Sequence, residues 1–209
     1  MIPLDVWLPY TLACLLIIVS PGPDSLLVIA RGISQGKKAA IVSSVGVSCG
    51  LLIHAGAAAF GLALLLQTSA LAFTAVKVVG AGYLIWLGLK ALLTNDLISF
   101  SSKQHKPMKA VFWSGFFTNV LNPKPLFFIL AFVPQFISPA YGDLTSQTLQ
   151  LGAWYAVLAL VLMVVLSAFS ARVAGALQAR QRLVTGLNKG AGLMFLTAGL
   201  SVAFMERDS

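Results

Sequence analysis

Two pairs of prolines, each pair separated by one residue, interrupt apolar stretches of this chain. Pro21-Gly22-Pro23 lies in the apolar segment 5–30, and Pro123-Lys124-Pro125 lies in the segment 111–138. Each proline removes a backbone donor and clashes with the preceding helical turn, so we expect both motifs to break a helix. The freed carbonyls and amides cannot face an apolar environment and must lie in protein or line a wet cavity. The motifs therefore predict two interrupted helices with backbone groups available to a ligand.

Ionisable and amide side chains gather at both breaks. Asp24 follows the first break and is the only acid deep within an apolar segment, whereas Lys124 lies between the prolines of the second. A half-helix N-terminus attracts an anionic group, and freed carbonyls attract a cation or an ammonium, so paired breaks suit a zwitterion. The binding residues predicted on this basis are Ser20, Pro21, Gly22, Pro23, Asp24, Asn119, Asn122, Pro123 and Lys124.

Asp24 and Lys124 are expected to meet halfway along the two segments, where a substrate or a proton alternately separates and rejoins them. Ionisable groups at such depth usually face a cavity or each other, so the alternative is a static ion pair that locks the two segments together. His54 is the only histidine in an apolar segment. It is a candidate, with Asp24, for proton coupling, or else it forms a hydrogen bond to a neighbouring helix.

The side chains that metal or nucleophilic catalysis needs are scarce. The chain has 2 histidines, 2 cysteines and 6 acidic residues, without a His-Glu-x-x-His motif or a pair of acids. No Walker-type glycine-rich loop is present, so ATP is not expected to drive the protein directly. We therefore expect no bound metal, no cofactor and no enzymatic activity.

The composition is that of a membrane protein. Of 209 residues, 58% are hydrophobic and 10% are charged, against about 45–50% and about 25% in a soluble domain. The net charge of +8 comes from lysine and arginine residues that are scattered singly between apolar blocks. This pattern does not favour nucleic-acid binding. A span needs roughly 20 apolar residues. We predict an all-α polytopic protein with one transmembrane domain over 1–209 and six spans, at about 5–30, 39–66, 70–93, 111–138, 149–171 and 185–204.

The basic residues predict an orientation for these spans. They occur in the links after the first, third and fifth spans, whereas the links 67–69 and 138–148 contain no Lys or Arg. By the positive-inside rule the three basic links, including the loop 95–109, are cytoplasmic and both termini are periplasmic.

An internal repeat is the next feature. The Pro-x-Pro motif recurs after 102 positions, and Gly80-Ala81-Gly82 recurs after 110 positions as Gly190-Ala191-Gly192. Each half, about 1–94 and 110–205, then holds three spans, and an odd number forces the halves into opposite orientations. The prediction is a pair of inverted three-helix repeats, with helices 1 and 4 broken.

Small and aromatic residues predict how the helices pack and where they end. Gly46 and Gly50 form a small-xxx-small face for close helix approach. Aromatic residues near span ends are expected to be interfacial anchors, namely Trp7, Tyr10, Trp113, Trp154 and Tyr155.

Several of these motifs together resemble the LysE/RhtB family of bacterial amino-acid exporters. They are Ser20-Pro21-Gly22-Pro23, Gly36 with its neighbouring bases, Gly80-Ala81-Gly82-Tyr83-Leu84, Trp86-Leu87-Gly88, Asn119-Val120-Leu121-Asn122-Pro123-Lys124 and Pro134-Gln135-Phe136. The resemblance covers essentially the whole chain. It implies a proton-driven antiporter of the inner membrane that exports amino acids or related metabolites, such as homoserine, threonine, leucine or homoserine lactone. The glycine-rich faces of the predicted helices permit a homodimer.

Two other classes of function remain open from the residues alone. Broken helices also coordinate ions, so a channel or small-ion transporter is the main alternative. A membrane-embedded enzyme is the other, although the chain offers no evident catalytic group.

Overall fold

The computed structural model describes residues 2–20, 22–68, 70–93, 105–170, 172 and 181–204. Every regular element in this part of the chain is helical. Each of the six apolar segments coincides with a long helix or with a pair of helices joined at a bend. The fold is therefore all-helical, as the composition predicts.

The first apolar segment forms two helices with a bend between them. Helix α1 spans Leu4–Val19 and helix α2 spans Pro23–Gln35, and their axes differ by 56°. The chain leaves the helical conformation at Ser20, and Gly22 is fully extended before Pro23 begins α2. Proline suits a first helical position, where its missing N–H has no partner to lose. The predicted break is confirmed here, although Pro21 itself lies outside the described residues.

The fourth apolar segment is interrupted in the same way. Helix α5 spans Met108–Val120, and helix α6 spans Pro123–Phe132 and continues as a short 3-10 helix, η1, over Val133–Phe136. The two halves bend by 47°. The side chain of Asn122 caps α6 by accepting a hydrogen bond from the Lys124 amide, and Pro123 begins the helix. The second predicted break is therefore also confirmed.

The remaining helices are continuous. They are α3 over Lys37–Thr68, α4 over Ala70–Leu93, α7 over Leu144–Ala168 and α9 over Gln181–Phe204, with a short 3-10 turn, η2, at Pro139–Tyr141. Two stretches, Lys37–Gly61 and Leu144–Ala168, are each long and apolar enough to cross a membrane. The two bent pairs also qualify if each is one span, which gives up to four candidate spans in the described residues. Helix α4 contains an apolar stretch, Val78–Lys90, that is shorter than these candidate spans.

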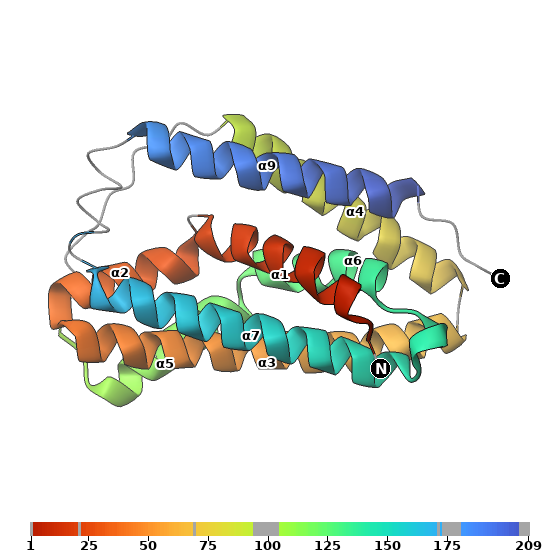
Figure 1. The fold of residues 1–209 in the computed structure, drawn as a ribbon. Helices are drawn as coiled ribbons and strands as arrows, with labels where there is room; N and C mark the ends of the chain where they lie inside the picture. Colours follow the sequence, from red (N-terminus) through yellow and green to blue (C-terminus); the bar gives the residue numbers. More distant parts are fainter. Residues whose placement is uncertain are drawn as a thin grey trace.

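The helices form two groups with the broken helices between them. Helix α3 packs against α5 and α7, and α4 packs along α9 (Figure 1). Helices α1 and α6 lie between these groups, and α6 contacts α3, α4 and α9. The breaks are thus placed in the interior of the molecule.

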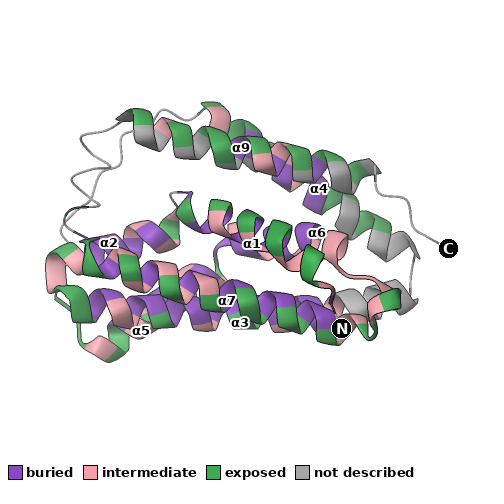
Figure 2. Cartoon of the chain, in the orientation of Figure 1, coloured by how far each residue is buried: buried purple, intermediate pink, exposed green. Residues whose placement is uncertain are grey.

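Apolar side chains cover the outside as well as the inside of the helices. On α7, Tyr155, Ala159 and Met163 are buried, whereas Val157, Val161 and Val165 are about half exposed. Exposed and buried residues alternate in this way around most of the helices (Figure 2). A helix that is apolar on every side belongs in a membrane, where its outer face meets lipid.

Two aromatic residues lie elsewhere than the sequence predicts. Tyr10 and Tyr155 are not interfacial anchors, because they are only 0% and 4% exposed. The Tyr10 hydroxyl donates to the Leu151 carbonyl at 3.1 Å, which fastens α1 to α7. Trp154 is partly exposed, and its indole N–H donates to the Thr11 hydroxyl at 2.9 Å.

Candidate functional site

The two breaks meet at one small cavity. Of the predicted binding residues, Ser20, Gly22, Asp24, Asn119, Asn122 and Lys124 all line it. Pro23 and Pro123 do not line it. They begin α2 and α6 and are exposed, so their contribution is to end the preceding helices. Pro21 lies outside the described residues. The two breaks therefore come together, as predicted. Six of the nine predicted binding residues line the cavity between them.

The Asp24 carboxylate is held by the second break. Its Oδ2 accepts from Asn119 Nδ2 at 2.9 Å and from Asn122 Nδ2 at 3.1 Å. Both amides come from residues that flank the interruption between α5 and α6. The other carboxylate oxygen, Oδ1, is buried and has no hydrogen-bond partner. An ionised carboxylate can accept about four hydrogen bonds, so Asp24 retains free capacity on its Oδ1.

The Lys124 ammonium is held by the first break in return. Its Nζ donates to the Ser20 carbonyl at 3.0 Å. That carbonyl belongs to the last turn of α1, where a helix leaves its final carbonyls without intrahelical partners. Each break therefore provides the group that binds the charged residue of the other.

Asp24 and Lys124 are not joined as an ion pair. Within the described residues no Lys124 nitrogen lies within 4.0 Å of an Asp24 oxygen, although both line the cavity. The predicted meeting of the two residues is therefore at the same cavity but without direct contact. The static ion pair that was the alternative is absent in this conformation.

His54 reaches the same network from α3. Its Nε2 lies 3.0 Å from the Asn119 carbonyl oxygen, and His54 is 5% exposed. Because a carbonyl only accepts, this hydrogen bond requires a proton on Nε2. His54 does not line the cavity itself, but Asn119 connects it to Asp24 in one chain of hydrogen bonds.

Close approach of α3 and α5 positions Asn119. A Cβ atom on Gly46 would collide with the backbone carbonyl oxygen of Phe112, and one on Gly115 would collide with that of Ser43. A Cβ atom on Gly50 would lie 2.8 Å from Asn119 Oδ1. The predicted role of the Gly46–Gly50 face in close packing is confirmed, and the same face leaves room for the Asn119 side chain.

Apolar and aromatic side chains complete the lining of the cavity and were not predicted from the sequence. They come from α1, α3 and α7, namely Ile17, Ile18, Val47, Leu51, Tyr155, Ala159 and Met163. The cavity has a volume of about 30 Å³, which is room for a single water-sized group. An amino acid requires the walls to move apart.

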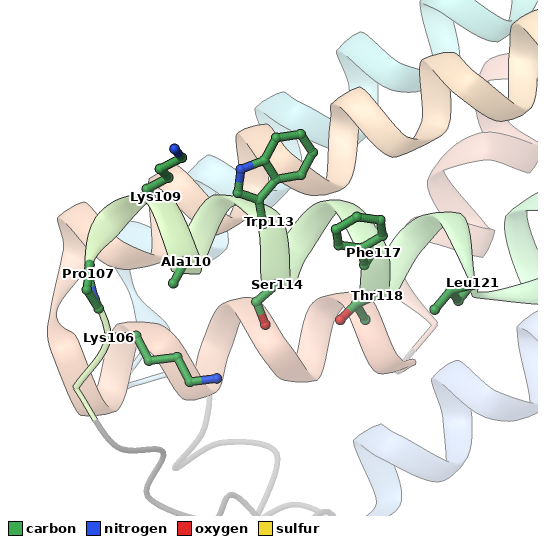
Figure 3. Close-up of a pocket in the computed structure, with 9 residues that line it drawn as sticks. All are labelled: Lys106, Pro107, Lys109, Ala110, Trp113, Ser114, Phe117, Thr118 and Leu121. Carbon is green, nitrogen blue, oxygen red and sulfur yellow. The ribbon is translucent and has the colours of Figure 1, made fainter.

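A second, larger hollow runs along α5. It has a volume of about 800 Å³ and extends from Lys106 and Lys109 at the start of the helix to Leu121, next to Asn122 of the small cavity (Figure 3). Trp113 and Phe117 project from one side of α5, and Ser114 and Thr118 project from the other. The groove therefore has a basic end and leads toward the break.

The described residues contain no group of three or more His, Cys, Asp or Glu side chains that could hold a metal ion. The polar groups at the cavity are a carboxylate, an ammonium, amides and hydroxyls. These groups suit binding by charge and hydrogen bonds.

Residues 15–206 match the family model of the LysE type translocators. The chain belongs to the LysE type translocator family. As a LysE type translocator it is a transport protein of the membrane and not an enzyme. The resemblance seen in its motifs is thereby confirmed.

Two of three similar bacterial proteins match nearly the whole of this LysE type translocator, and the third matches about two thirds of it. A homoserine/homoserine lactone efflux protein of Salmonella typhimurium is 33% identical over 200 residues, which are 94% of this chain and 95% of the relative. An uncharacterized membrane protein of Vibrio cholerae is 30% identical over 201 residues, 96% of this chain and 97% of the relative. A threonine efflux protein of Escherichia coli is 30% identical over 157 residues, 68% of this chain and 74% of the relative. No solved structure shows a significant match to the chain.

Proposed function

We propose that this protein exports small amino acids, or closely related amines, from the bacterial cytoplasm by alternating access. One observation supports this more than any other: the Asp24 carboxylate and the Lys124 ammonium line the same cavity but are not bound to each other. Asp24 is bound by the break between α5 and α6, and Lys124 by the break between α1 and α2. An incoming amino acid carries the complementary pair of charges. Its ammonium can bind the free Asp24 Oδ1, and its carboxylate can draw Lys124 away from the Ser20 carbonyl.

The named relatives agree with the amine as the essential group. Homoserine, threonine and homoserine lactone, which appear in the names of those proteins, all possess an α-amine. The lactone lacks a free carboxylate but keeps a carbonyl oxygen, which can accept a hydrogen bond from Lys124. Binding through Asp24 therefore suits all three compounds.

The proposed architecture is six spans in two inverted three-helix repeats. The two bent pairs support it, because α1 with α2 and α5 with α6 are interrupted in the same manner and contribute reciprocal groups to one site. Transporter sites are commonly built at such paired discontinuous helices. The two repeats would then move relative to one another and open the cavity to each side in turn.

Charge supports an orientation with both termini in the periplasm. Lys37 and Lys38 begin α3, and Lys106 and Lys109 lie at the start of α5, at the same end of the molecule. Asp5 and Asp143 lie at the opposite end, at the starts of α1 and α7. By the positive-inside rule the lysine end is cytoplasmic. The groove along α5 then opens to the cytoplasm and is the proposed entry path, with its lysines attracting the substrate carboxylate.

Exchange in proteoliposomes tests this function. Liposomes loaded with unlabelled threonine or homoserine should accumulate the radiolabelled compound when they contain the protein, and empty liposomes should not. A channel would let the label equilibrate without requiring substrate inside the vesicles. Equilibration that is indifferent to internal substrate, or no uptake of either compound, would contradict the proposal.

Proton coupling is proposed to pass through Asp24 and His54. Replacement His54→Gln keeps a donor at the position of Nε2 and so keeps the bond to the Asn119 carbonyl, but removes the titratable ring. We expect substrate exchange to stay within about threefold of the natural protein, since one neutral hydrogen bond replaces another. Uptake driven by an imposed pH gradient should instead be lost. Equal gradient-driven uptake by the variant would assign His54 a structural role only.

A further inference from the structure

Tyr155 differs from the other residues of α3 and α7 that line the cavity. Of the cavity-lining residues that α3 and α7 contribute, four are aliphatic or Met, namely Val47, Leu51, Ala159 and Met163. Tyr155 is the one among them that carries a hydroxyl. Its ring packs against Phe128, with the centroids 5.2 Å apart, so the side chain is held in place.

The Tyr155 hydroxyl makes no hydrogen bond to any residue in the described part of the chain, although Tyr155 is only 4% exposed. Tyr10, which is similarly buried on α1, uses its hydroxyl to bind the Leu151 carbonyl. A phenol hydroxyl inside a protein usually has such a partner. The hydroxyl of Tyr155 is therefore available to a group that enters the cavity.

We propose that Tyr155 determines substrate specificity by hydrogen bonding to a hydroxyl on the substrate's side chain. This inference rests on the proposed function, because it takes the substrate's amine to bind Asp24 in the same cavity and the substrate's side chain to lie against the lining residues of α3 and α7. Apart from Tyr155 that surface is apolar, so the preferred substrate is a small, neutral amino acid with one hydroxyl group.

The matching pairs of compounds are threonine with valine, in which a methyl group replaces the hydroxyl, and homoserine with 2-aminobutyrate, in which a hydrogen atom replaces it. A site that hydrogen-bonds a hydroxyl rejects the analogue lacking it, because its own polar group is then left without a partner. We expect exchange in proteoliposomes to favour the hydroxylated member of each pair by about fivefold or more in apparent affinity. A preference below twofold in the natural protein would overturn the inference, whatever the variants do.

The Tyr155→Phe variant removes the hydroxyl and keeps the ring. It should lower exchange of threonine while sparing valine, so that the preference falls to about one. Tyr10→Phe is the matched control: it removes a structural bond, so it should lower thermal stability and leave the preference unchanged. A Tyr155→Phe protein with an unchanged preference would overturn the inference. Failure of all four compounds to exchange would instead contradict the proposed function.

Discussion

Replacing Asp24 by asparagine is expected to lower substrate exchange at least about 30-fold while the protein still folds. The charge pair in question is the Asp24 carboxylate with the substrate's ammonium. Removing one partner of a buried, hydrogen-bonded charge pair costs about 2 kcal/mol or more, which corresponds to that factor. Folding should survive because Oδ2 alone accepts the bonds from Asn119 and Asn122, and the carbonyl oxygen of an asparagine can accept both. The variant therefore removes the charge of Asp24 and keeps the hydrogen bonds that hold the side chain in place.

The measurement is initial exchange in proteoliposomes, with thermal unfolding of the purified protein as the test of folding. Asp5→Asn is the matched control, because Asp5 is an exposed acid in the first turn of α1, away from the cavity. It should change neither quantity. Exchange by Asp24→Asn at the rate of the natural protein would show that Asp24 does not bind the transported amine.

Gly46→Ala is expected to disrupt the packing of α3 on α5. The added methyl group would collide with the Phe112 carbonyl oxygen, which is backbone and cannot turn aside as a side chain would. Overpacking of this kind costs about 1–3 kcal/mol and sometimes more. Because Asn119 lies on α5 and binds Asp24, separation of the two helices should also lower transport.

Thermal unfolding in detergent and exchange in proteoliposomes measure the two effects. Gly56→Ala provides the control on the same helix, since no heavy atom lies within 4 Å of the position that its Cβ would take. It should be neutral or slightly stabilising, because alanine favours helices more than glycine does. If Gly46→Ala is as stable and active as Gly56→Ala, the close contact of α3 with α5 does not position the site.

The breaks and the polar residues at them could be predicted because their causes are local. Two prolines one residue apart cannot lie inside a helix, whatever surrounds them. Asp24, Asn119 and Lys124 were identifiable because polar groups are conspicuous in an apolar sequence. The partner of Lys124 was not predictable: its bond to the Ser20 carbonyl depends on how two distant breaks are placed against each other.

The contribution of α7 was missed for a different reason. The buried stripe Tyr155, Ala159 and Met163 is no more apolar than the exposed stripe Val157, Val161 and Val165. In a helix surrounded by lipid and protein, hydrophobicity does not distinguish the face that lines a cavity from the face that meets lipid. The predicted span 149–171 puts Tyr155 near an end and so favours an interfacial anchor, but α7 begins at Leu144, and Tyr155 is buried near the middle of the helix.

Binding of threonine and N-acetylthreonine to the natural protein and to Asp24→Asn tests most directly whether Asp24 binds the substrate's amine. Acetylation removes the positive charge from the amine and keeps the rest of the compound. In the natural protein it should weaken binding at least about 30-fold. In Asp24→Asn both compounds should bind with nearly equal, low affinity, because the charge that distinguished them is gone. A loss on acetylation that is as large in Asp24→Asn as in the natural protein would show that the amine binds elsewhere, and would contradict the account.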